Sequence, residues 1–103
     1  MNSDILILYS RQGCCLCQAL EKKLSNICLE NLTPSILLSI VDIDSKKVSL
    51  GIQMKYTNQV PVIVLDSFRL SKKIELPRVS PRLKEDMLLS WIQKNLNILY
   101  KNA

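Results

Sequence analysis

The stretch "SRQGCCLCQALEKKL", residues 10–24, holds three of the four cysteines of this chain. It follows the apolar run "ILILY" at residues 5–9, a pattern that is typical of a buried strand. From Cys15 to Cys28, apolar residues recur every three or four positions, with charged residues on the other side, which predicts an amphipathic helix. The C-x-x-C pair Cys14 and Cys17 is therefore expected at a junction between a strand and a helix.

The next segments complete a strand, helix and strand unit. The apolar run "ILLSIVDI" at residues 36–43 predicts a second buried strand, which makes a parallel crossover unit with the first strand and the helix. Residues 48–56 fit a strand or a helix. We predict a helix there, with Ser45 as its N-cap.

The last third of the chain predicts two strands and a helix. A strand should begin at Val60-Pro61 and turn near Asp66-Ser67, and a short returning strand should lie between residues 68 and 76. Ser80 is expected to cap a final helix with Pro81 at its first position. The apolar stripe of that helix includes Trp91, which we expect in the core.

Composition narrows the class of protein. The 103 residues fit one domain spanning residues 1–103, and the hydrophobic share of 48% excludes a disordered chain. No apolar run approaches the length of a membrane span, and no signal-peptide pattern opens the chain. The net charge of +5 is scattered, and aromatic residues make up only 5%. We expect a cytoplasmic monomer that binds neither nucleic acid nor membrane.

The C-x-x-C spacing suits redox chemistry. The first cysteine would lie over the unpaired N–H groups of a helix start, which favour the thiolate and lower the pKa of Cys14. Cys17, one turn further on, could then attack a mixed disulfide formed on Cys14. Arg11, three residues ahead, could stabilise the thiolate and receive a substrate carboxylate. Two alternatives stay open for this pair. The cysteines could be small residues that pack at a helix start, or they could be half of a metal site.

The other two cysteines are expected to have no chemical role. Cys15 should point away from its neighbour at the top of the helix, where we expect an exposed spectator, with a wrong disulfide partner or a site of oxidation as the alternatives. Cys28 should lie on the same helix face as Cys17 and act as a small buried hydrophobe. A closed zinc site needs four cysteine or histidine ligands, and the chain has no histidine and no second cysteine pair, so we expect no metal.

The order of the elements resembles the thioredoxin fold. The stretches "YSRQGCCLC" and "QVPVIVL" are most similar to the glutaredoxins and their small bacterial glutaredoxin-like relatives. This resemblance implies an α/β fold in which a βαβ unit precedes a ββα unit, with a mixed four-stranded sheet flanked by helices. It also implies a cis bond between Val60 and Pro61 facing the active-site sulfur. Gln59, Val60 and Pro61 would then flank the substrate, with Gln59 in place of the family's Thr.

The resemblance implies a thiol-disulfide oxidoreductase that reduces protein or glutathione mixed disulfides through Cys14 and Cys17. The reductant would be glutathione or a protein dithiol, and no cofactor is expected beyond glutathione as a candidate co-substrate. The chain reads "LPRVSPRL" where glutaredoxins have a Gly-Gly segment that binds glutathione, which leaves the electron donor open. The alternatives are a carrier of a metal or an iron–sulfur cluster on the same fold, and an interaction module with idle thiols.

Overall fold

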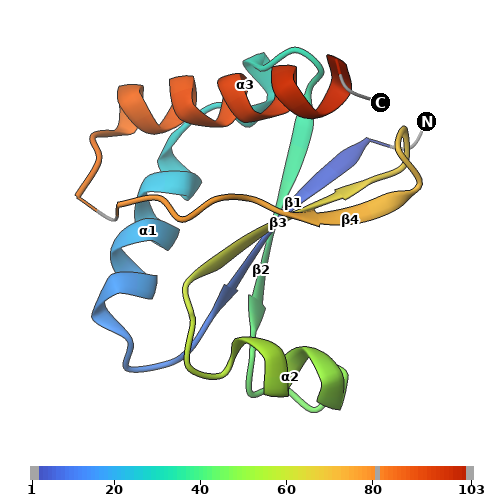
Figure 1. Cartoon of the computed structure of the whole chain (residues 1–103). Coiled ribbons are helices and arrows are strands. Elements are labelled where there is room, and N and C mark those ends of the chain that lie inside the picture. The colour runs from blue at the N-terminus through green and yellow to red at the C-terminus, as the bar shows by residue number, and fades with distance from the viewer. Residues whose placement is uncertain (1–2, 81, 102–103) are drawn as a thin grey trace.

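The computed structural model describes residues 3–80 and 82–101. Strands and helices follow one another along the chain in the order that the sequence predicts (Figure 1). The elements are β1 (Asp4–Ser10), α1 (Cys15–Asn26), the 3-10 helix η1 (Leu29–Asn31), β2 (Ile36–Asp42), α2 (Leu50–Tyr56), β3 (Val62–Ser67), β4 (Lys72–Glu75) and α3 (Glu85–Lys101).

The four strands form one mixed sheet in the order β2-β1-β3-β4. Strand β1 pairs in parallel with β2, with Ser10 opposite Asp42. It pairs antiparallel with β3, with Tyr9 opposite Val62, and β3 pairs antiparallel with β4. The ends of β1 and β2 and the start of β3 therefore meet at one edge of the sheet. The predicted thioredoxin-like fold is confirmed.

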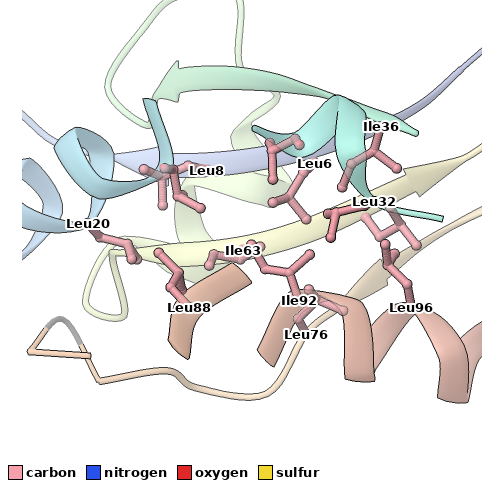
Figure 2. Packing of buried hydrophobic residues seen from close by; sticks show 13 residues of the cluster. Leu6, Leu8, Leu20, Leu32, Ile36, Ile63, Leu76, Leu88, Ile92 and Leu96 are labelled. Carbon is pink, nitrogen blue, oxygen red and sulfur yellow. The ribbon is translucent and has the colours of Figure 1, made fainter. Parts of the chain in front are cut away.

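The core lies on both faces of the sheet because the side chains of its central strands alternate in direction. On one face, Leu6 and Leu8 of β1 pack against α1 and α3 (Figure 2). The buried residues of this larger cluster are Leu6, Leu8, Leu20, Leu24, Leu29, Leu32, Ile36, Ile63, Leu65, Leu76, Leu88, Ile92 and Leu96. On the other face, Ile7 and Tyr9 pack with Tyr56 of α2 in a smaller cluster. Trp91 is partly buried against the larger cluster, as expected.

Helix α2 begins later than predicted. Its N-cap is Ser49, whose side-chain oxygen accepts a hydrogen bond from the Ile52 N–H at 3.3 Å. Ser45 instead accepts from the Lys47 N–H within a turn that precedes the helix. The prediction of Ser45 as N-cap is wrong because two serines four residues apart both offer a capping oxygen, and the tertiary structure uses the second.

The C-terminal boundaries also shift. Helix α3 begins at Glu85 rather than directly after Ser80, whose side chain and carbonyl hold a preceding turn by accepting from Arg82 N–H and Leu83 N–H. Pro81, predicted as the first helical residue, lies outside the described residues. Strand β3 runs through Ser67, so the hairpin turn comes at residues 68–71 and not at Asp66-Ser67.

Cys28 is exposed, and the prediction that it is buried on the face of Cys17 is wrong. Helix α1 ends at Asn26, and Ile27 has an extended backbone with φ of −94° and ψ of 153°. The helical spacing that placed Cys28 beneath the helix therefore stops two residues before it.

Asp4 is a buried polar residue at the end of the sheet where β1 begins. Its carboxylate accepts hydrogen bonds from the Ser67 hydroxyl at 2.6 Å, the Phe68 N–H at 2.8 Å and the Tyr100 hydroxyl. Burial would raise the pKa of Asp4, but the hydrogen bonds from Ser67, Tyr100 and the hairpin backbone outweigh it and lower the pKa below 3.8. Asp4 thus joins the start of β1, the β3–β4 turn and the end of α3.

Replacing this carboxylate should destabilise the protein in a pH-dependent way. Asp4→Asn removes the charge and replaces one of the two accepting oxygens with an NH2 donor, so we expect the free energy of unfolding at neutral pH to fall by about 1–3 kcal/mol. Because the pKa of Asp4 is lowered on folding, its contribution is present above pH 3.8 and disappears as the pH falls through the folded-state pKa. The free energies of unfolding of both proteins are measured in urea at neutral pH and below pH 3.8. A Glu30→Gln variant, in which an exposed carboxylate is replaced, is the control. An equal gap between wild type and Asp4→Asn at both pH values would contradict it.

The packing of α3 gives a second prediction. Leu96 is 0% exposed in the larger cluster, whereas Ile98 on the same helix is 48% exposed. Leu96→Ala should lower the free energy of unfolding by about 2–5 kcal/mol because it leaves a cavity. Ile98→Ala, which removes a similar volume, should cost under about 1 kcal/mol, and comparable costs in denaturant unfolding would show that α3 packs differently.

Candidate functional site

The loop from β1 to α1 and the segment from α2 to β3 lie at the same edge of the sheet (Figure 1). In the first, the Cys14 N–H donates to the Arg11 carbonyl at 3.3 Å, which closes a tight turn. Gly13 in this turn has φ of +79°, a conformation that costs little only for glycine. The turn sets Cys14 at the point where the helix begins.

Cys14 and Cys17 are joined by a disulfide, and their Cα atoms are 5.2 Å apart. Cys14 is the N-cap of α1, and its Sγ accepts a hydrogen bond from the Cys17 N–H at 3.2 Å. The Cys14 carbonyl accepts from the Gln18 N–H, which is the first bond of the helix. One sulfur therefore occupies the place that a serine or aspartate oxygen takes at other helix starts.

The two sulfurs differ in access. Cys17 is 0% exposed and packs into the first turn of α1, whereas Cys14 is half-buried at the mouth of the turn. Of the two residues, Cys14 alone has exposed surface, whereas Cys17 has none. The geometry can exchange a disulfide at Cys14 and close the ring again through Cys17.

Arg11 is clamped between two other segments. Its Nε and Nη2 atoms donate to the two carboxylate oxygens of Asp44, at 2.8 Å and 3.1 Å. Its Nη1 donates to the Thr57 carbonyl and its Nη2 to the Thr57 hydroxyl, both at 2.8 Å. The hydrogen bond to Asp44 raises the pKa of Arg11, so the side chain is always charged. Arg11 thus ties the cysteine turn to the segment after β2 and to the end of α2.

Asp44 and Thr57 are site residues that sequence reasoning missed. The signal for Asp44 was present, since two parallel strands end at the same edge and the pairing of Ser10 with Asp42 sets Arg11 beside the residues that follow β2. No pattern in the sequence singles out Thr57, which reaches Arg11 only because of how α2 is placed.

Two tyrosines hold the end of α2 on the sheet. The rings of Tyr9 and Tyr56 lie 5.5 Å apart, and both side chains are buried. Burial, with a contribution from Glu75, raises the pKa of Tyr56 to about 12, so its hydroxyl stays neutral at physiological pH. This contact fixes the residue directly before Thr57 and hence the partner of Arg11.

The predicted substrate residues lie in the segment that leads into β3. Gln59 is exposed, and its N–H donates to the Tyr56 carbonyl at 2.9 Å. Val60 packs against the smaller cluster, Pro61 is half-buried, and the peptide bond between them is cis. Since Val62 pairs with Tyr9, this segment and the Cys14 turn flank the same end of the β1–β3 pair. Their roles in binding stay a prediction.

Cys15 and Cys28 carry free thiols, and both are exposed. Exposure of Cys15 agrees with its expected position at the top of the helix. Among the described residues, no helix is both long and apolar enough to cross a bilayer.

The model of the Glutaredoxin-like domain (DUF836) family matches residues 5–93. The matched segment spans the cysteine pair, the Arg11 clamp and the sheet. The chain belongs to this family of glutaredoxin-like proteins.

Two solved structures are similar to this chain. A malarial protein shares 20% identity, with a TM-score of 0.58 over 90% of this chain and 97% of its own. A structural genomics target protein from X. campestris also shares 20% identity, with a TM-score of 0.47 over 86% of this chain and 96% of its own. No curated protein matches the chain. At 20% identity, the similarity to the malarial protein is evidence for the fold and not for function.

The burial of the sulfurs predicts an order of alkylation. In the oxidised protein, iodoacetamide should label Cys15 and Cys28 only, because the other two sulfurs are bonded. After reduction, Cys14 should react next, and Cys17 about tenfold more slowly, since reactivity requires an accessible thiolate. Peptide mass spectrometry over a time course reports each site. Equal rates at Cys14 and Cys17 would contradict the difference in access.

Proposed function

We propose that the protein is a thiol-disulfide oxidoreductase in which Cys14 attacks and Cys17 resolves. The proposal rests on one observation: a disulfide at a helix start joins a partly exposed cysteine, Cys14, to a fully buried one, Cys17. Membership of the glutaredoxin-like family supports the same chemistry.

The reaction begins with the reduced dithiol. The Cys17 N–H that points at the Cys14 sulfur, together with the N-terminal dipole of α1, favours the thiolate at this position. The Cys14 thiolate attacks one sulfur of a substrate disulfide, forms a mixed disulfide and releases the other sulfur as a thiolate, which takes up a proton.

The second step closes the ring. The Cys17 thiol loses its proton and attacks the Cys14 sulfur, which forms the intramolecular disulfide and releases the second substrate thiol. Two electrons pass from the protein dithiol to the substrate disulfide. An external thiol, either glutathione or a protein dithiol, restores the dithiol by the reverse exchange.

The surrounding residues have proposed roles in binding. The backbone of Val60 and Pro61 would hold an extended substrate segment against the Cys14 sulfur, with Gln59 at its rim. Arg11 would hold the turn in shape and add positive charge near the thiolate. Disulfide-containing proteins are the proposed substrates, and no cofactor enters either step. The proposed setting is a reducing compartment such as the cytoplasm, with the protein acting as a monomer.

Single cysteine variants test the proposal. Cys14→Ser should lower the rate of disulfide reduction by at least about a hundredfold, because the attacking thiolate at the start of α1 is lost. Cys17→Ser should accumulate a mixed disulfide on Cys14, which intact-protein mass spectrometry detects. Cys15→Ser removes a neighbouring exposed thiol and is the matched control, with a rate close to that of the wild type. Equal rates in all four proteins would exclude the mechanism.

A further inference from the structure

We infer that Asp44 is a specificity-determining residue that excludes substrate carboxylates from Arg11, so that the site selects disulfides flanked by neutral or basic groups. The inference rests on the proposed function, since it concerns the substrates of the same site. Arg11, the cation of the cysteine turn, is already bound by Asp44 and Thr57.

Both hydrogen-bonding sides of the Arg11 guanidinium have partners. Asp44 binds the Nε and Nη2 side with both carboxylate oxygens, and Thr57 takes the Nη1 and Nη2 side with its carbonyl and hydroxyl. A guanidinium has five N–H donors, and these contacts use four of them. A substrate carboxylate could bind Arg11 in the two-oxygen geometry only by displacing one of these partners.

Asp44 is difficult to displace because it is part of the chain. Its N–H donates to the Asp42 carboxylate at 2.9 Å, which fixes the turn directly after β2. An internal partner held in place competes at a high effective concentration with any free ligand. A dilute anion must overcome that advantage before it gains contact with Arg11.

The same carboxylate also faces the adjoining surface. A shallow groove beside Arg11 is lined by Asp44, Gln53, Met54 and Thr57. Asp44 is 57% exposed and Arg11 only 32%, so the anion is presented to solvent more than the cation. The described residues that line this groove include no lysine or arginine. A carboxylate of a substrate that reaches this groove meets the like charge of Asp44, whereas a neutral or cationic group does not.

Three small disulfides of different charge separate this effect from general activity. Glutathione disulfide carries carboxylates, 2-hydroxyethyl disulfide is neutral and cystamine is cationic. We expect Asp44→Asn to raise the ratio of rate constants for glutathione disulfide over 2-hydroxyethyl disulfide by about threefold to tenfold, the effect of one exposed charge. The ratio for cystamine over 2-hydroxyethyl disulfide should fall. Ratios within one variant cancel any change in the folded fraction.

Two further variants test whether the change in substrate preference depends on the pair Arg11 and Asp44. Glu30→Gln removes an equal charge from an exposed residue of η1, before β2 rather than after it, and should leave both ratios as in the wild type. In the double variant Arg11→Gln/Asp44→Asn, the gain for glutathione disulfide should be smaller than in Asp44→Asn, because the freed cation is gone and only the relief of repulsion by Asp44 remains. An equal gain in the presence and absence of Arg11 would overturn the inference.

A binding measurement keeps the inference testable apart from catalysis. S-methylglutathione carries the carboxylates but has no exchangeable sulfur, and its affinity can be measured by NMR titration. Threefold to tenfold tighter binding to Asp44→Asn than to the wild type supports the inference. Equal affinities overturn it, even where every disulfide is reduced at a normal rate. A wild type that reduces none of the three disulfides would contradict the proposed function, and the titration would still decide the role of Asp44.

Discussion

The site depends on one constraint, which is that the central strand β1 has a parallel neighbour on one side and an antiparallel neighbour on the other. A parallel partner ends where β1 ends, and an antiparallel partner begins there. The cysteine turn, the segment after β2 and the approach to β3 are therefore brought to one edge. The hydrogen bonds of Arg11 to Asp44 and Thr57 join these three segments to one another.

Within that edge, the start of α1 separates the roles of two chemically identical thiols. The N-cap position leaves the Cys14 sulfur at the end of the helix, where a backbone N–H reaches it at 3.2 Å. Cys17, in the first turn of the helix, has no exposed surface. A difference of three residues in the sequence thus becomes a difference between an accessible sulfur and a protected one.

Sequence reasoning succeeded where a pattern is local. The apolar runs of β1, β2 and β3 were recognisable because a strand buried on both faces is apolar at successive positions, and the stripe of α3 because a helix that covers a sheet is apolar at a fixed period. It failed at boundaries and at long range. Ser45 and Ser49 are equivalent by sequence, and the end of α1 before Cys28 carries no glycine or proline at that position to mark it. The contact of Arg11 with Thr57 spans 46 residues and follows from no periodicity.

By itself the sequence determined the strand and helix order, the cysteine pair at a helix start and the Val-Pro entry to a strand, because each of these is written in neighbouring residues. The tertiary structure alone decided what surrounds that pair. In the packed chain Cys17 is buried and Cys28 is exposed. The Arg11 guanidinium donates to Asp44 and Thr57. The reason is that a charged side chain takes its partners from whatever segments the sheet brings within hydrogen-bonding distance, and only the packed chain sets those distances.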